Sequence, residues 1–153
     1  TFFTSGLEES RSALDSFYEQ WKHEPLVVDQ WLITQALCPS DDTLDRVKDL
    51  RKHQAFEIKN PNKVRSLIGT FCSQNHVQFH ELGGQGYEFL GDCIIELDQI
   101  NPQIAARLTT PLTRWRKYDH VRQALIQAQL QRIKEVPQLS KDVFEVVEKS
   151  TIL

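Results

Sequence analysis

The clearest helix start in the sequence is the run Asn60-Pro61-Asn62-Lys63-Val64-Arg65-Ser66-Leu67-Ile68-Gly69-Thr70-Phe71-Cys72. The side-chain oxygen of Asn60 can accept hydrogen bonds from the free amides of a first turn, and Pro61 follows where a missing N–H costs nothing. Apolar residues then recur at helical spacing and form one stripe: Val64, Leu67, Ile68 and Phe71. We therefore predict a helix that begins at this Asn-Pro pair, ends near Ser73 and carries Arg65 beside its apolar stripe.

A second Asn-Pro start occurs at Asn101-Pro102, and the two Asn residues are 41 positions apart. It is followed by Gln103, by an apolar stripe and by Arg107 near the edge of that stripe. In HEAT-like and armadillo-like arrays of helices, each repeat is about 40–47 residues long. The spacing favours such an array. From the residues alone, the simpler interpretation of each arginine is a solvated charge whose stem lies on apolar surface.

Helical periodicity extends over the rest of the chain, and no strand pattern interrupts it. Further helices are expected at 5–22, 26–37, 42–52, 87–99, 101–108, 112–117, 119–136 and from 140 onward, with 74–86 as the least helical segment. Ser5 and Glu8 form a plausible capping box for the first helix, and we expect Trp21 and Trp31 in a packed seam. We predict an all-α fold for a single domain over residues 1–153, a superhelical stack of antiparallel helix pairs with about eight to ten helices.

The composition is that of an ordinary globular domain, with 40% hydrophobic and 25% charged residues in 153. A net charge of −3 gives no basic footprint for nucleic acid and no polybasic membrane anchor. No apolar run approaches the roughly 20 residues that a membrane span needs. The three cysteines, Cys38, Cys72 and Cys93, lie in or beside apolar stripes and indicate buried thiols, which favours a reducing, cytoplasmic location. We therefore expect no nucleic acid and no membrane among the partners.

Six ordered runs carry a resemblance to a known family: D-S-F-Y-E-Q-W at 15–21, P-L-V-V-D-Q-W at 25–31, N-P-N-K-V-R-S-L-I-G at 60–69, G-Y-E-F-L at 86–90, E-L-D-Q-I-N-P-Q-I-A-A-R-L at 96–108 and T-P-L-T-R at 110–114. Together they resemble the C-terminal domain of bacterial aminopeptidase N, a zinc-dependent gluzincin that removes N-terminal residues from peptides. The catalytic elements of that family, the H-E-x-x-H zinc helix and the G-A-M-E-N segment, belong to another domain. Neither occurs in this sequence. The absence of Met and the start at Thr1 agree with a piece of a longer polypeptide.

The resemblance implies an accessory role. In the family, the C-terminal helical domain closes over the catalytic domain, walls off an internal cavity and restricts substrate entry. Matched residue by residue, Arg65, Gln103 and Arg107 would face that cavity and bind the leaving-group side of the peptide. No catalytic residue and no metal ligand is expected in this chain, since the zinc would belong to the parent enzyme. The implied partners are the catalytic domain of the same polypeptide and peptide substrates, and exposed apolar patches are expected where sister domains pack.

Other interpretations of the residues stay open beside the hypothesis of an accessory domain. His76 and His80 have the spacing of two zinc ligands on a helix, but Val77 stands where H-E-x-x-H has Glu, so we do not expect a metal there. No G-x-S-x-G or C-x-x-C signature points to catalysis by this chain, and we expect the fragment alone to be inactive. The alternative function is a free-standing helical-repeat adaptor that binds another protein, and a third is an independent hydrolase.

Overall fold

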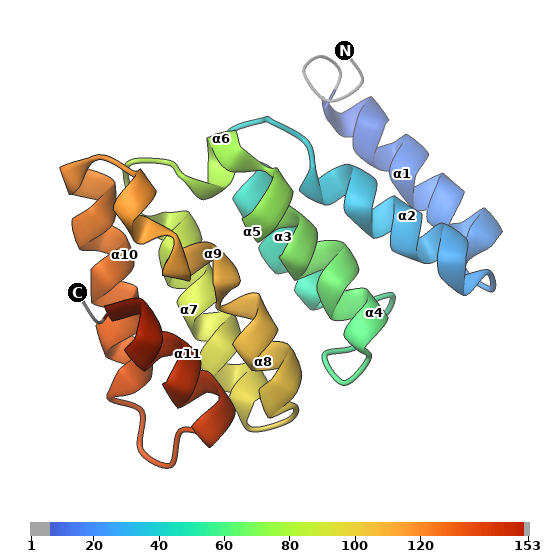
Figure 1. Ribbon diagram of the computed structural model, residues 1–153. Helices are drawn as coiled ribbons and strands as arrows, with labels where there is room; N and C mark the ends of the chain where they lie inside the picture. The colour runs from blue at the N-terminus through green and yellow to red at the C-terminus, as the bar shows by residue number, and fades with distance from the viewer. Residues whose placement is uncertain (1–6, 152–153) are drawn as a thin grey trace. The chain divides into compact units, whose positions relative to one another are not determined.

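A computed structural model describes residues 7–151, with side chains for residue 9 and residues 11–151. All regular secondary structure in this part of the chain is helical, which confirms the all-α prediction (Figure 1). The chain divides into two compact units, unit 1 at Thr1–Gln78 and unit 2 at Phe79–Leu153. Each unit has its own helices and its own core, and each is described by itself.

Unit 1 contains the helices α1 (Leu7–Trp21), α2 (Pro25–Ala36), α3 (Thr43–Arg51), α4 (Pro61–Val64), η1 (Arg65–Gly69) and α5 (Thr70–Gln74), and α6 (His76–Phe79) begins in it. The helices α1 and α2 form an antiparallel pair joined by a short turn (Figure 1). On its other side α2 packs against α3 and against the continuous run α4–η1–α5. The core between these helices includes Trp31, Leu32, Val47, Leu50, Val64, Leu67, Ile68 and Phe71.

Polar side chains tie the helices of unit 1 together at their ends. The indole Nε1 of Trp31 donates to the carbonyl oxygen of Leu14 at 2.9 Å, which fixes α1 against α2. The buried amide of Asn75 donates to the carbonyl oxygens of Ala36 at 2.9 Å and of Cys38 at 2.8 Å. These carbonyls lie at the end of α2, where a helix leaves its last C=O groups without internal partners. Asn75 therefore joins the end of α5 to the end of α2.

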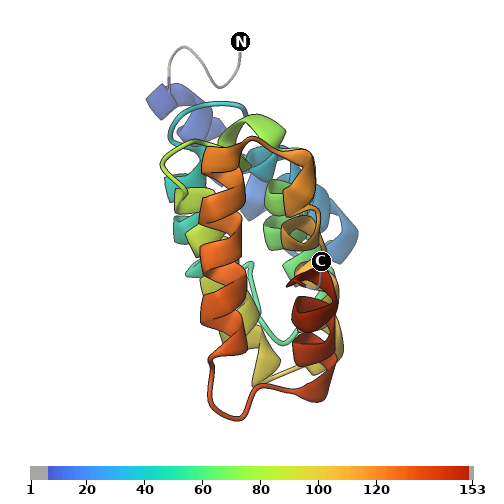
Figure 2. The same ribbon diagram turned by 60° about the vertical axis from the view of Figure 1, so that its left-hand side comes forward.

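Unit 2 contains α7 (Gln85–Asp98), α8 (Pro102–Leu108), α9 (Thr110–Thr113), the single-turn η2 (Trp115–Lys117), α10 (His120–Lys134) and α11 (Lys141–Thr151). The central helix α7 packs against α8 and α10, and α11 packs against α8, α9 and α10. Figure 2 shows α10 and α11 as an antiparallel pair joined by one loop. The core of this unit includes Tyr87, Leu90, Ile94, Leu97, Leu112, Ile126, Leu130, Ile133, Val143 and Val147.

The last helix of unit 2 is held at both ends. The carboxylate of buried Asp98 accepts from the backbone N–H of Ser140 at 2.9 Å and from its hydroxyl, and the Ser140 hydroxyl accepts from the N–H of Val143 at 3.2 Å. At the other end, the Ser150 carbonyl accepts from Trp115 Nε1 at 2.9 Å and from the Arg116 guanidinium at 3.0 Å. Both terminal turns of α11 therefore have side-chain partners from elsewhere in the unit.

Most sequence expectations hold in residues 7–151, and four differ. One is the helix expected at 112–117, where the structure has α9 ending at Thr113 and a separate turn, η2, beginning at Trp115. With α4–η1–α5 taken as one helix and η2 left out, these residues contain ten helices, within the predicted eight to ten. The segment 74–86 contains one helical turn, α6, and the helix after Asn60 includes a wide π turn, neither of which was predicted. Trp31 is buried as expected, but Trp21 is 39% exposed, so the packed position predicted for it is wrong. The capping box at Ser5 and Glu8 lies outside the described residues, and no helix within 7–151 is long and apolar enough to cross a membrane.

Candidate functional site

Arg65 lies at the start of a wide helical turn in unit 1. Asn60 caps the helix as predicted, since its Oδ1 accepts from the N–H of Asn62 at 3.0 Å, and Pro61 occupies the first helical position. The Arg65 side chain is exposed, and its guanidinium donates to the side-chain oxygen of Asn62 one turn earlier. The guanidinium of Arg65 therefore lies at the surface of unit 1, with Asn62 as its hydrogen-bond partner.

The turn that follows Arg65 is a π helix over Arg65–Gly69. The N–H of Thr70 donates to the carbonyl of Arg65, five residues back, and the Thr70 hydroxyl donates to the same carbonyl at 3.3 Å. The buried side chains Ser66, Leu67 and Ile68 hold the widened turn in the core. Such turns are rare in proteins and are frequent at functional sites. Apart from Gly69 within the helical segment, nothing in the sequence indicates this turn.

Gln103 and Arg107 lie together in unit 2, one turn apart on α8. Asn101 caps this helix through a 3.3 Å bond from the N–H of Ile104, and Pro102 follows in the first turn. Residues four apart share a helix face, and both Gln103 and Arg107 are exposed while Ala105 on another side of α8 is buried. Neither exposed side chain hydrogen bonds to any other residue within 7–151. An amide and a guanidinium are thus available side by side.

The segment of the sequence that contains α8 is basic. Residues 99–118 contain four basic side chains, those of Arg107, Arg114, Arg116 and Lys117, and no acidic one. A guanidinium is always protonated and offers a planar fork of donors, which suits a carboxylate or a row of peptide carbonyls. The face of α8 that carries Gln103 and Arg107 can therefore bind peptide acceptor groups, while Arg65 offers the same chemistry within unit 1.

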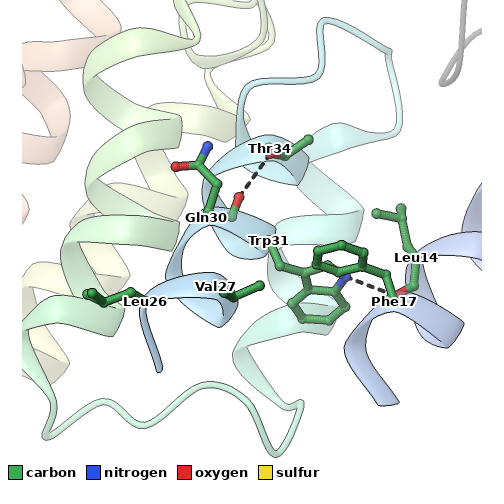
Figure 3. A pocket seen from close by; sticks show the side chains of 7 residues that line it. All are labelled: Leu14, Phe17, Leu26, Val27, Gln30, Trp31 and Thr34. Carbon is green, nitrogen blue, oxygen red and sulfur yellow. Dashed lines mark hydrogen bonds between the residues drawn. The ribbon is translucent and has the colours of Figure 1, made fainter. Parts of the chain in front are cut away.

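An apolar groove in unit 1 was not located from the sequence. It lies along α1 and α2 and has a volume of about 450 Å³. Figure 3 shows its lining, in which side chains of α1 reach toward those of α2: Leu14, Phe17, Leu26, Val27, Gln30, Trp31 and Thr34. None of these side chains is charged. The groove is therefore suited to apolar groups and lacks the ionic partners that would bind a free carboxylate or amine.

The histidines considered as metal ligands have other surroundings. His76 is exposed on α6, whereas His80 Nδ1 is 2.7 Å from the hydroxyl of Tyr87 and its ring stacks on Tyr118 at 4.4 Å between centroids. Burial raises the pKa of Tyr87 to about 12, so the phenol stays protonated and can donate to His80. Within the described residues, no group of three or more His, Cys, Asp or Glu side chains could hold a metal ion.

Comparison with known families extends over almost the whole chain. The family model described as "Domain of unknown function (DUF3458_C) ARM repeats" matches residues 2–152. ARM repeats are arrays of short helices that stack on their neighbours. This match confirms the armadillo-like fold class predicted from the two Asn-Pro starts and from the helical periodicity.

Curated relatives carry the name aminopeptidase N. The chain is 46% identical to aminopeptidase N of Caulobacter vibrioides over 138 residues and 44% identical to that of Haemophilus influenzae over 137 residues, with 90% of this chain covered in each case. Identity to aminopeptidase N of Escherichia coli is 40% over 141 residues, or 92% of this chain. The matched part is only 16% of each relative, so the chain spans about one sixth of their length.

A solved structure shares both sequence and fold. The crystal structure of Legionella pneumophila aminopeptidase A in complex with aspartic acid is 41% identical, with a TM-score of 0.89. The similarity covers 95% of this chain and 17% of that one. The resemblance to aminopeptidase N that the sequence motifs indicated is confirmed by the curated relatives.

Proposed function

This chain belongs to the family of ARM-repeat domains described as DUF3458_C, and from this premise we propose that it is the accessory C-terminal domain of a zinc aminopeptidase. The observation that carries the proposal is the 40–46% identity to three aminopeptidases N over 90% or more of the chain. The parent enzyme would remove N-terminal residues from peptides. Residues 1–153 would act as a single helical domain that closes the catalytic cavity and restricts substrate entry.

Zinc, general base and recognition of the substrate N-terminus would come from parts of the polypeptide outside this chain. In this proposal hydrolysis takes place in the catalytic domain, and the role of this chain is to enclose and bind the substrate. We expect the 153 residues alone to be inactive, with the catalytic domain of the same polypeptide as partner. A cytoplasmic location is part of the proposal and is supported by three free, buried cysteines.

In this proposal Arg65, Gln103 and Arg107 bind the substrate beyond its first residue. The exposure of all three side chains supports the role, as does the pairing of an amide with a guanidinium on one face of α8. Carbonyls and the terminal carboxylate of the leaving peptide are the acceptors that such donors fit. A substrate that lacks residues on this side should make none of these contacts.

The test compares two kinds of substrate in the full-length enzyme. Arg107→Ala is expected to lower kcat/KM about ten-fold for tripeptides, the loss of one charge-assisted hydrogen bond, and to leave single-residue chromogenic substrates nearly unchanged. Equal losses on both substrate classes would contradict a role on the leaving-group side. A full-length polypeptide without aminopeptidase activity would overturn the proposed function altogether and leave the adaptor as the alternative.

A further inference from the structure

The guanidinium of Arg65 has a neutral hydrogen-bond partner. Its Nη2 donates to the side-chain oxygen of Asn62, three residues earlier on the same helix face. Other arginines of the described residues pair with carboxylates: Arg11 with Asp42, Arg122 with Asp119 and Arg132 with Asp92. Within residues 7–151, Arg65 forms no ion pair with a carboxylate. The amide of Asn62 therefore holds one nitrogen of this guanidinium without neutralising its charge.

The backbone of Asn62 is itself held from two directions. Its N–H donates to Oδ1 of the capping residue Asn60 at 3.0 Å. Its carbonyl oxygen accepts from the hydroxyl of Ser66 at 2.7 Å, and Ser66 is buried. The side chain that receives the Arg65 hydrogen bond thus extends from a fixed first turn of the helix.

The backbone of Arg65 is anchored on its C-terminal side by the wide turn. Its carbonyl oxygen accepts from both the N–H and the hydroxyl of Thr70, the hydroxyl at 3.3 Å. Thr70 is only 4% exposed, so this anchor belongs to the core of unit 1. The main chain of Arg65 is therefore tied to the core, and its guanidinium is tied to the first turn of the same helix.

Ordering the Arg65 side chain in advance lowers the cost of binding a ligand to it. A free arginine at a surface samples many rotamers, and a ligand that binds it has to stop that motion. The bond to Asn62 uses one N–H group, and a guanidinium carries five. The remaining donors can bind a carboxylate or peptide carbonyls. A carboxylate in the place of Asn62 would order the same side chain but would also compensate its charge.

We propose that Asn62 is a positioning residue for Arg65. Its neutral oxygen holds the guanidinium in one orientation and leaves the full positive charge available to the part of the peptide beyond the first residue. Asn62 acts through Arg65. The inference rests on the proposed function, in which Arg65 binds substrate.

The test uses the full-length polypeptide with two substrates that share their first residue, trialanine and alanine p-nitroanilide. Asn62→Ala is expected to raise KM for trialanine about three- to ten-fold, with little change in kcat and none for the anilide. Alanine has the higher helix propensity, so the fold should be retained. In an Arg65→Ala background the same substitution should change nothing further. An unchanged KM in the original background, or an equal rise in both backgrounds, overturns the proposal.

Asn62→Asp tests the neutrality of the partner. It keeps an acceptor oxygen and places a negative charge in the first turn of a helix, where such a charge is favourable, so the urea midpoint should not fall. KM for trialanine should nevertheless rise about three-fold or more, because the charge of Arg65 is compensated. Gln74→Glu is the control, since it adds the same charge at an exposed position near the other end of the helical run and should leave KM unchanged. A merely structural hydrogen bond would make Asp equal to Asn, so an unchanged KM in Asn62→Asp overturns the proposal.

Arg65→Ala separates failure of this inference from failure of the proposed function. If Arg65→Ala raises KM for trialanine and Asn62→Ala does not, the positioning role is wrong and substrate binding by Arg65 stands. If Arg65→Ala leaves KM for trialanine unchanged, the proposed role of Arg65 is wrong and the inference about Asn62 is overturned with it.

Discussion

Lys63 and Asp29 form an ion pair in unit 1 with side chains that are only 11% and 16% exposed. The Lys63 ammonium also donates to the carbonyl oxygen of Pro25 at 3.2 Å. The pair joins the first turn of α4 to the first turns of α2. It thereby connects the helix that carries Arg65 to the helix that lines the apolar groove.

Asp29→Ala is expected to lower the free energy of unfolding by about 2–3 kcal/mol, because it leaves the Lys63 ammonium nearly buried without its counter-ion. Urea denaturation measures the loss. The matched double variant Lys63→Met with Asp29→Leu replaces both charges by apolar groups of similar size and should lose less than Asp29→Ala alone. A larger loss in the double variant would show that the pair itself contributes net stability.

Arg65→Lys tests whether substrate binding needs the planar, two-pronged donor geometry of the guanidinium and not only its positive charge. Lysine keeps the positive charge but cannot make two parallel hydrogen bonds, so under the proposed function KM for tripeptides should rise about three- to ten-fold in the full-length polypeptide. Steady-state kinetics with tripeptides checks this expectation. Arg11→Lys is the control, since that exposed arginine pairs with Asp42 on another part of unit 1. An equal effect of both substitutions would argue against substrate binding by Arg65.

The pH dependence of stability should carry a contribution from His53. Burial lowers the pKa of His53, the positive charge of Arg46 lowers it further, and the carboxylates of Asp15 and Glu19 oppose the shift without reversing it. The neutral ring accepts at Nδ1 from the N–H of Ala55 at 3.0 Å. Since the folded-state pKa lies below the unfolded value of about 6.5, this stability is fully present above that pH and is lost as pH falls below it.

The measurement is the urea midpoint between pH 7.5 and 5.5, with His53→Gln as reference. The original protein should lose more stability over this range than His53→Gln, whose neutral amide does not titrate. The indole of Trp31, whose ring centroid is 5.3 Å from that of His53, offers a local fluorescence probe. Parallel curves for the two proteins would contradict the assignment.

Gly86→Ala should destabilise unit 2 strongly. A Cβ at this position would lie 2.3 Å from the carbonyl oxygen of Phe79, a backbone atom that cannot move aside cheaply. The expected loss is about 2–3 kcal/mol, typical of forced overpacking, and thermal unfolding measures it. Gly83→Ala is the control, because its nearest neighbour, Cγ of Gln85, is 4.0 Å away. Similar stability of the two variants would contradict the close approach at Gly86.

The fold could be predicted from sequence because its signals are local. Asn60-Pro61 and Asn101-Pro102 start helices by their own chemistry, and both side-chain caps form. The π turn could not be predicted, since its hydrogen bonds depend on how Ser66, Leu67 and Ile68 pack in the core. Trp21 was misplaced for a related reason: its spacing puts it on the apolar stripe, but only tertiary packing decides which part of a stripe is covered.

The candidate site was predictable only in part. The sequence placed Gln103 and Arg107 in the helix that Asn101-Pro102 starts, and the structure shows both on one exposed face of it. Their role toward peptide came from resemblance to a family and stays a prediction. The groove along α1 and α2 was not located in advance, because a cavity arises from the distance between helices. The sequence led us to expect exposed apolar patches without locating them. In the structure Leu26, which is 81% exposed, is such an exposed apolar residue.

The wide turn at Arg65–Gly69 also governs how this helix tolerates insertions and deletions. Its bonding takes up one residue more than an α turn, so removal of Gly69 would let the segment close into regular α geometry. On both sides of the deletion, between Asn60 and Gln74, the same side chains would then still point toward the core. A deletion elsewhere in the helix rotates everything beyond it by about a quarter turn or more. Length variation among homologous chains is therefore expected at this one position.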